Sequence, residues 1–227
     1  MSLVMAGDSG HSRLIFGADS KIRYIPPFER LVRTGSGSKV TVFSGSWGNL
    51  AVGYAGLWTE GLDDDLLHNV LTRWEAASQS ISELCNLLAR EVAQPLTRRS
   101  FDEGFPNLSE FLVGYFPLRD NPSLHYVSSG SSERVPVGVI RAIGGDPRYT
   151  FTQRHLPPSG EEVDRRFLVD AFARDLTRAP SDAYDYPLLV VEISGPAVED
   201  ISRQYVGQDL LPTAAPAILK EIPRPLA

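Results

Sequence analysis

The sequence LIFGADSK at residues 14–21 and the sequence KVTVF at residues 39–43 are the most informative parts of this chain. Each holds a short apolar run with a charged residue at its boundary: Asp19 follows the first run, and Lys39 precedes the second. Such runs are typical of buried strands. The end of one buried strand and the start of the next can meet at one end of a sheet, where each charge shifts the proton affinity of the other. The two residues therefore mark a candidate active site.

Two hairpins surround this pair. Residues 3–6 and 14–18 flank Gly7-Asp8-Ser9-Gly10, a glycine-containing turn, and residues 39–43 return through residues 49–56. Apolar runs separated by short glycine-containing turns are typical of β-hairpins. We therefore expect the chain to begin with strands.

Beyond Gly56 the apolar spacing changes to three and four residues, which predicts helices. One helix is marked by Leu62, Leu66, Val70, Leu71 and Trp74, and a third by Val163, Phe167, Leu168, Ala171, Phe172 and Leu176. Between them, Ser80 and Glu83 form a capping-box pattern at the start of a second helix, which Pro95 ends.

Further strands are predicted at residues 111–116, 124–127, 135–143 and 188–193. Grouped strands and grouped helices indicate an α+β fold with mainly antiparallel sheets, and they argue against a βαβ Rossmann pattern. Residues 1–206 are predicted to form a single domain, and residues 207–227, with four prolines, a Pro-rich C-terminal arm.

The composition excludes several classes of protein. The 227 residues are 42% hydrophobic and 22% charged, which is ordinary for a globular domain. The net charge is −6 and the basic residues are dispersed, so we expect no nucleic-acid partner. The first residues lack a signal-peptide pattern and no apolar run reaches the length of a membrane span, so we expect a cytoplasmic protein that does not bind membranes.

Other motifs have structural interpretations. Cys85 shares a helical face with apolar residues, which indicates a buried packing residue rather than a catalytic thiolate. Gly7-Asp8-Ser9-Gly10 matches the tetrapeptide around the nucleophile of chymotrypsin-like proteases, but no histidine precedes it, so a turn is favoured. The four histidines lack the spacing of zinc ligands, and we expect neither a metal nor a cofactor.

The order of elements from Val4 to Ile193 resembles the proteasome β-subunit group of N-terminal-nucleophile (Ntn) hydrolases. In that family, the first residue of the mature chain attacks an amide, and its own α-amino group takes the proton. The resemblance implies a four-layer αββα sandwich with two mainly antiparallel sheets. A free α-amine suits the task because its pKa is about 8.

Individual positions of the family carry over to this chain. Asp19-Ser20-Lys21 resembles the Asp-Ser-Arg motif, whose aspartate orients the catalytic lysine, and Lys39 resembles that lysine. Gly53-Tyr54-Ala55-Gly56 resembles the strand end that supplies an oxyanion-hole N–H, around Ala55 or Gly56 here. Residues 111–115 and Ala142-Ile143-Gly144-Gly145 resemble the Gly-Tyr-Asp strand and the Ile-Gly-Ser-Gly turn.

The chain also departs from the family pattern. Gly145 stands where the turn has its serine, and Arg178 stands where a serine follows the Arg-Asp that Arg174-Asp175 resembles. Counting back from Asp19 with the family spacing reaches Leu3, which carries no nucleophile. Ser2 fits as the nucleophile if Met1 is removed and the hairpin loop holds one extra residue; Met-Ser-Leu is also a common vector-derived start.

Three functions remain open at this point. The first is a proteasome-like peptidase in which Ser2 attacks, while Lys39 and Asp19 tune the site and Lys21, Gly56 and Asp175 support it. The second is a catalytically silent scaffold or ring subunit of the same fold, and the third is a small-molecule amidase. The resemblance implies a homo-oligomer, a ring or stacked ring, acting on a peptide or small amide.

Overall fold

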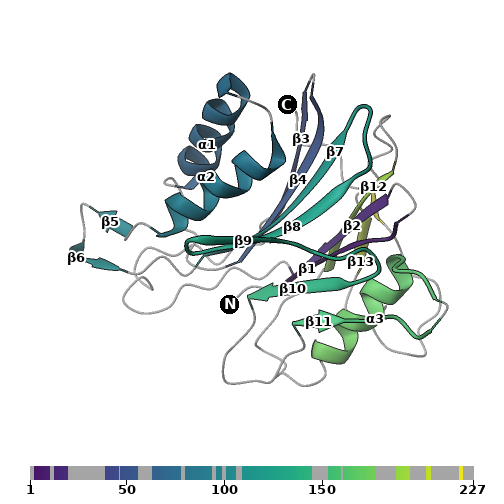
Figure 1. Cartoon of the computed structure of the whole chain (residues 1–227). Helices are drawn as coiled ribbons and strands as arrows, with labels where there is room; N and C mark the ends of the chain where they lie inside the picture. The colour runs from purple at the N-terminus through teal and green to yellow at the C-terminus, as the bar shows by residue number, and fades with distance from the viewer. Residues whose placement is uncertain are drawn as a thin grey trace.

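Two stacked β-sheets form the centre of the molecule, and helices cover the outer face of each (Figure 1). The structure is a computed structural model. It describes residues 3–10, 13–19, 39–45, 47–55, 63–77, 80–93, 96–98, 101–105, 109–144, 153–159, 161–176, 188–194, 203–205 and 220–221. The predicted α+β, four-layer αββα architecture is confirmed.

One sheet has seven strands, and its neighbouring strands pair antiparallel throughout. The order across it is β11 (Arg154–His155), β10 (Ile140–Gly144), β1 (Leu3–Asp8), β2 (Arg13–Ala18), β12 (Leu188–Ser194), β13 (Arg203–Tyr205) and β14 (Lys220–Glu221). The first predicted hairpin is confirmed, because β1 pairs with β2 with Asp8 opposite Leu14.

The second sheet has five strands, again antiparallel. Its order is β3 (Val40–Gly45), β4 (Gly48–Ala55), β7 (Glu110–Pro117), β8 (Ser123–Ser128) and β9 (Ser131–Arg134). Two further strands, β5 (Leu96–Arg98) and β6 (Phe101–Phe105), pair only with each other among the described residues.

The helices lie where the periodicity predicts them. Helices α1 (Asp63–Ala77) and α2 (Ile81–Ala93) cover the five-stranded sheet, and α3 (Arg165–Leu176) covers the seven-stranded sheet (Figure 1). The Ser80 carbonyl accepts the N–H groups of Glu83 and Leu84 at the start of α2. The Asp164 carboxylate accepts the Phe167 N–H at 2.7 Å and so caps α3. No helix in the described part of the chain is long and apolar enough to cross a membrane.

Strand β1 is apolar without alternation because it is buried on both faces. Leu3 and Met5 belong to the core under α3, whereas Val4 and Ala6 belong to the core between the two sheets. A strand's side chains alternate between its faces, so one continuous apolar run serves two cores. This central position fixes the ends of β1 and β2, where Asp19 lies.

One strand prediction was wrong in its bounds. A strand was expected over residues 135–143, but the structure has β9 over residues 131–134 and β10 starting at Ile140. Pro136 and Gly138, whose φ is +78°, interrupt the run between them. All four residues of β9 are exposed and polar, so no apolar pattern marks this edge strand.

Little of the predicted arm, residues 207–227, belongs to the described part of the chain. Its described residues, Lys220 and Glu221, pair with β13 at the edge of the seven-stranded sheet. The arm itself stays a prediction.

Replacing Gly48 by alanine should lower the free energy of unfolding by about 1–3 kcal/mol or more. Gly48 has a φ of +126°, and a Cβ there would overlap the Phe116 carbonyl oxygen. Gly130 is a matched control, because its φ is +71° but a Cβ would have no neighbour within 4 Å. Denaturant unfolding measures both variants, and an equal loss in the two would contradict the overlap.

Candidate active site

Asp19 and Lys39 form a buried ion pair that bridges the two sheets. Asp19 directly follows β2, and Lys39 directly precedes β3. The Lys39 Nζ lies 2.7 Å from the Asp19 Oδ1, and the two side chains are 1% and 2% exposed. The two residues that the sequence singled out therefore meet, each at a strand end, but the two strands belong to different sheets and not to one sheet as expected.

The backbone holds both residues in place. The Asp19 N–H donates to the Leu3 carbonyl at 3.1 Å, and the Leu3 N–H donates to the Asp19 Oδ1 at 2.6 Å. The Tyr54 N–H donates to the Lys39 carbonyl at 3.0 Å. The first residue of β1, the end of β2 and the start of β3 are thereby tied around one carboxylate.

A buried ion pair of this kind makes little net contribution to the free energy of unfolding. Two charges lose their hydration on burial, and their attraction and hydrogen bonds roughly offset that loss. An apolar pair of similar volume would serve the core equally well. A buried lysine with a fixed carboxylate partner at the end of a central strand is consequently a functional candidate.

Leu3 occupies the strand position that the family spacing gives to the nucleophile. It is fully buried, packs in the core under α3 and pairs with Gly144 of β10. Its amide nitrogen, not its side chain, faces the Asp19 carboxylate. The residue with a hydroxyl next to this point in the sequence is Ser2.

Three of the predicted site residues, Ser2, Lys21 and Gly56, lie outside the described residues, and so does Gly145. Strand β4 is described up to Ala55, which is buried and lies opposite Glu110 of β7. The predicted oxyanion hole near Ala55 or Gly56 therefore stays a prediction.

Asp175, the remaining predicted site residue, is buried near the end of α3. Its Oδ2 lies 3.1 Å from the Nε2 of His155 in β11, and both side chains are nearly inaccessible to solvent. Sequence reasoning missed this partner, because His155 stands 20 residues away with no motif around it. The pair joins α3 to the edge of the seven-stranded sheet.

Glu110 is a second residue that the sequence did not single out. Its Oε2 accepts the Gly144 N–H at 2.9 Å, and its Oε1 accepts the Tyr126 hydroxyl at 2.6 Å. Burial, and next the bond to Glu110, raise the pKa of Tyr126, so the phenol stays a donor. The carboxylate fixes the end of β10, opposite Leu3, against the other sheet.

Of the Gly7-Asp8-Ser9-Gly10 motif, which was predicted to be a turn, Gly7 and Asp8 are the last two residues of β1, and only Ser9 and Gly10 follow the strand. The Asp8 Oδ1 accepts the Gly10 N–H at 2.9 Å, and the Ser9 hydroxyl donates to the Arg13 carbonyl at 3.2 Å. Burial raises the pKa of Asp8, with the Gly10 N–H and the Arg134 charge opposing the shift. These bonds close the β1–β2 hairpin, so the motif has a structural role.

The prediction that Cys85 is a packing residue is confirmed, because it is 1% exposed in the core under α1 and α2. Burial raises the pKa of its thiol from 9.0 to about 12. The neutral thiol therefore makes its full contribution to the free energy of unfolding below pH 9.0. That contribution falls as the pH rises from 9.0 towards 12, because the unfolded chain loses the thiol proton first.

Labelling of Cys85 by a thiol reagent at about pH 8 should therefore be slower by about 100-fold or more in the native protein than in the unfolded chain. The release of chromophore from an aromatic disulfide reagent measures both rates. If the labelling rate in buffer is similar to the rate in guanidinium, the Cys85 thiol is accessible in the native protein and the prediction is wrong.

Neither a protein-family model nor a curated protein sequence matches this chain. Solved structures do match it over nearly its whole length. Anbu (Gly-1 mutant) from Hyphomicrobium sp. strain MC1 superposes with a TM-score of 0.66 at 13% identity, over 92% of this chain and 90% of that one. The chain has a proteasome-like Ntn-hydrolase fold.

Two further Anbu structures agree. Anbu (ancestral beta-subunit) from Yersinia bercovieri has a TM-score of 0.61 at 16% identity, over 92% of this chain and 89% of that one. The helical assembly of the Anbu complex from Pseudomonas aeruginosa gives 0.59 at 14% identity, over 92% and 88%. The likeness to Anbu at these identities establishes the fold alone.

Proposed function

We propose that this protein is a proteasome-like peptidase whose nucleophile is Ser2, made the first residue of the mature chain by removal of Met1. The observation that supports the proposal is the buried Asp19–Lys39 pair, in which the Asp19 carboxylate also accepts the N–H of Leu3, the residue next to Ser2. Such a pair places a positive charge close to the start of β1, and an N-terminal nucleophile needs a nearby cation to favour its ionised form.

In the proposed mechanism, the Ser2 hydroxyl attacks the carbonyl carbon of a peptide or small amide, and the α-amino group of Ser2 takes the hydroxyl proton. The amide nitrogen leaves with that proton, which yields an ester on Ser2. Water, deprotonated by the same amine, then hydrolyses the ester and regenerates the hydroxyl.

The other site residues have supporting roles in this proposal. Lys39 lowers the pKa of the nucleophile by its charge, and Asp19 holds the Lys39 ammonium. A backbone N–H near Gly56 stabilises the oxyanion, while Lys21 and Asp175 help to shape the site. A small-molecule amidase would use the same steps on a smaller substrate.

A catalytically silent scaffold of the same fold is the second candidate. The observation in its favour is Leu3, a buried leucine at the start of β1, where the family spacing requires a nucleophile. In that reading, Asp19 and Lys39 only tie β1, β2 and β3 together.

Hydrolysis of a panel of fluorogenic peptides by the untagged protein separates the two candidates. If the protein is a peptidase, it should hydrolyse at least one peptide, and a hydroxyl-directed inhibitor should abolish that activity. The inhibitor should form one adduct per chain, on Ser2. An inactive, unlabelled protein with Ser2 exposed as its first residue would leave the scaffold as the function.

We also propose a cytoplasmic homo-oligomer. Anbu from Pseudomonas aeruginosa, whose fold is similar, forms a helical assembly, and homo-oligomers in general associate through symmetric or repeating interfaces. Native mass spectrometry should show a ring, stacked ring or longer assembly at micromolar protein. A monomer under those conditions would contradict the proposal.

A further inference from the structure

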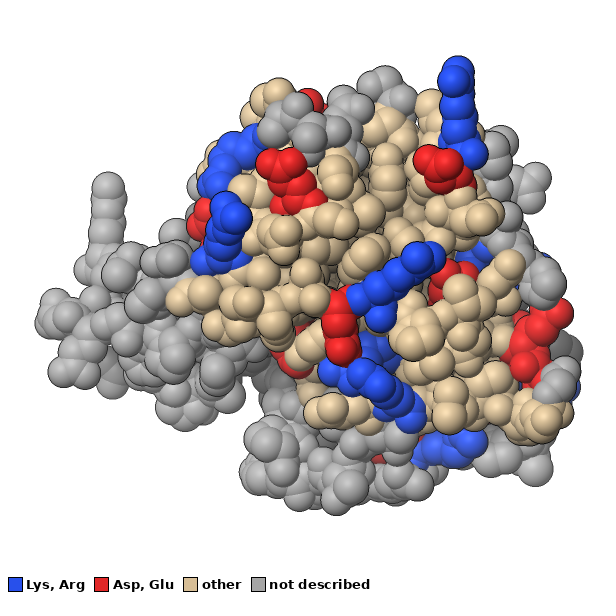
Figure 2. All heavy atoms as spheres, in the orientation of Figure 1, with Lys and Arg blue, Asp and Glu red and all other residues tan. Residues whose placement is uncertain are grey.

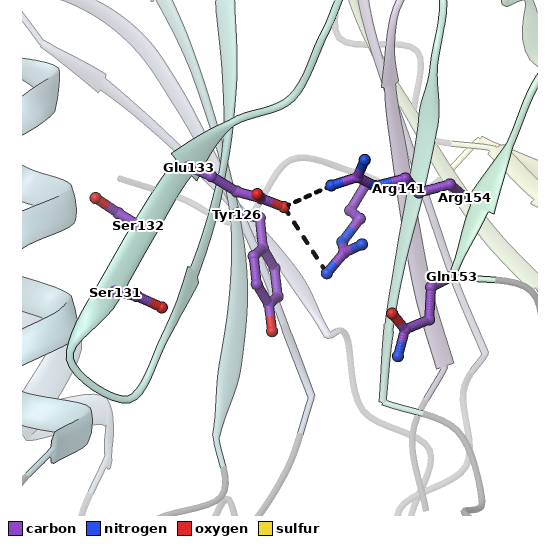
Figure 3. A pocket seen from close by; sticks show the side chains of 7 residues that line it. All are labelled: Tyr126, Ser131, Ser132, Glu133, Arg141, Gln153 and Arg154. Carbon is purple, nitrogen blue, oxygen red and sulfur yellow. Dashed lines mark hydrogen bonds and ion pairs between the residues drawn. The ribbon is translucent and has the colours of Figure 1, made fainter.

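An open pocket of about 720 Å³ lies between the edges of the two sheets, and none of its lining residues belongs to the proposed peptidase site. It is lined from β8 and β9 on one side and from β10, β11 and the residue before β11 on the other (Figure 3). Basic and acidic side chains stand side by side over this region in Figure 2. A pocket of this size can hold a small organic molecule.

Arg141 is the central residue of the pocket. Its side chain is only 11% exposed, and its guanidinium lies 4.3 Å from the centre of the Tyr126 ring. Its Nε is buried and has no hydrogen-bond partner among the described residues. A buried guanidinium with an unused N–H favours an acceptor that the described residues do not supply.

The acceptor at hand, Glu133, is poorly placed for Arg141. Its Oε1 is 3.9 Å from the Arg141 Nη2, beyond hydrogen-bond distance, and 3.1 Å from the Arg154 Nη2 (Figure 3). Glu133 is 47% exposed and Arg154 is 56% exposed, so their ion pair contributes little to stability. The Glu133 carboxylate can therefore move into water and leave both arginines to a ligand.

The rest of the lining also favours an oxyanion. Ser131 and Ser132 add hydroxyl groups and Gln153 an amide, so the pocket is rich in hydrogen-bond donors. Two guanidinium groups face one carboxylate, which makes the lining positive on a chain whose net charge is −6. Guanidinium groups bind phosphate and carboxylate through paired hydrogen bonds.

We propose that this pocket binds a small molecule through a phosphate or carboxylate group, which Arg141 and Arg154 hold and for which Glu133 competes. Binding requires neither Ser2 nor the Asp19–Lys39 pair. The site is thus separate from the proposed peptidase function, and a silent scaffold could have it equally well.

Isothermal titration calorimetry with inorganic phosphate and with succinate, each against sodium chloride at equal ionic strength, tests the proposal. The wild-type protein should bind at least one of the two, with a Kd on the order of 1 mM. Binding of phosphate alone indicates a phosphate ester as the ligand class, succinate alone a carboxylate, and binding of both their shared oxyanion chemistry.

Two substitutions should change the affinity for the anion in opposite directions. Arg154→Gln, on a half-exposed side chain, should weaken binding by about tenfold, because it removes one guanidinium. Glu133→Gln should strengthen binding by about threefold or more, because it removes the competing carboxylate. Gain of affinity on losing an ion pair is not expected from a purely structural role.

Arg73→Gln is the matched control. Arg73 is 54% exposed and pairs with Glu91 at 2.7 Å on the helical side of the molecule, so its loss changes the net charge equally. The Kd of Arg73→Gln for each anion should equal that of the wild-type protein. The proposal is overturned if neither anion binds beyond chloride, if Arg154→Gln and Arg73→Gln behave alike, or if Glu133→Gln fails to bind more tightly.

Discussion

Replacing Lys39 by methionine should lower the free energy of unfolding by about 3–5 kcal/mol. Methionine fills a similar volume, but the Asp19 carboxylate, 2% exposed, then loses the ammonium 2.7 Å away. The Leu3 N–H still donates to the carboxylate, but a backbone amide does not replace the charge of the ammonium. Urea unfolding followed by far-ultraviolet circular dichroism measures the loss.

The double variant Asp19→Asn, Lys39→Met should be more stable than the sum of the two single losses predicts. An asparagine keeps an oxygen for the Leu3 N–H and leaves no charge unpaired in the core. Arg73→Met is the control for this cycle, because the Arg73–Glu91 pair has the same length of 2.7 Å but is exposed, and its loss should stay within about 0.5 kcal/mol. Additive losses in the double variant would mean that the two charges are not coupled.

Changing Ser2 to alanine should reduce kcat/KM for peptide hydrolysis by about 10³-fold or more. Alanine removes the attacking hydroxyl and leaves the α-amine, the Asp19–Lys39 pair and the fold in place. The unfolding midpoint should therefore stay the same while the activity is lost. Initial rates with the best fluorogenic peptide of the panel provide the measurement.

Two further variants serve as controls for the loss of activity in Ser2→Ala. Ser2→Thr should keep part of the activity, because threonine retains a hydroxyl on the same atom. Ser9→Ala removes a hydroxyl that donates to the Arg13 carbonyl at the β1–β2 turn, and this variant should keep the full activity. Hydrolysis that survives in Ser2→Ala would place the nucleophile elsewhere.

Much of the fold follows from the apolar pattern because the central strands are buried on both faces. Strands β1, β2 and β4 are continuous apolar runs, and the helices have one apolar face each. Two edge strands, β9 and β11, have no such pattern: β9 is exposed throughout, and β11 has two residues. Their position depends on pairing with β8 and β10, which sequence spacing does not encode.

The same reason separates the predictable part of the site from the rest. Asp19 and Lys39 stand at ends of strands that the apolar pattern predicts, so the pattern places both charges at strand ends. Because β2 and β3 belong to different sheets, the stacking of the sheets brings the two charges into contact. Glu110, 34 residues from Gly144, and His155, 20 residues from Asp175, meet their partners only through the packing of one layer on another. Single polar residues inside or beside strands carry no signal of that kind.

The intact mass of the untagged protein, after incubation with a hydroxyl-directed peptide inhibitor, tests the central claim most directly. The proposed mechanism predicts a chain without Met1 that carries one adduct, with the adduct located on Ser2 by peptide mapping and absent from Ser2→Ala. A chain that retains Met1, or one that starts at Ser2 and takes no adduct there, would contradict it.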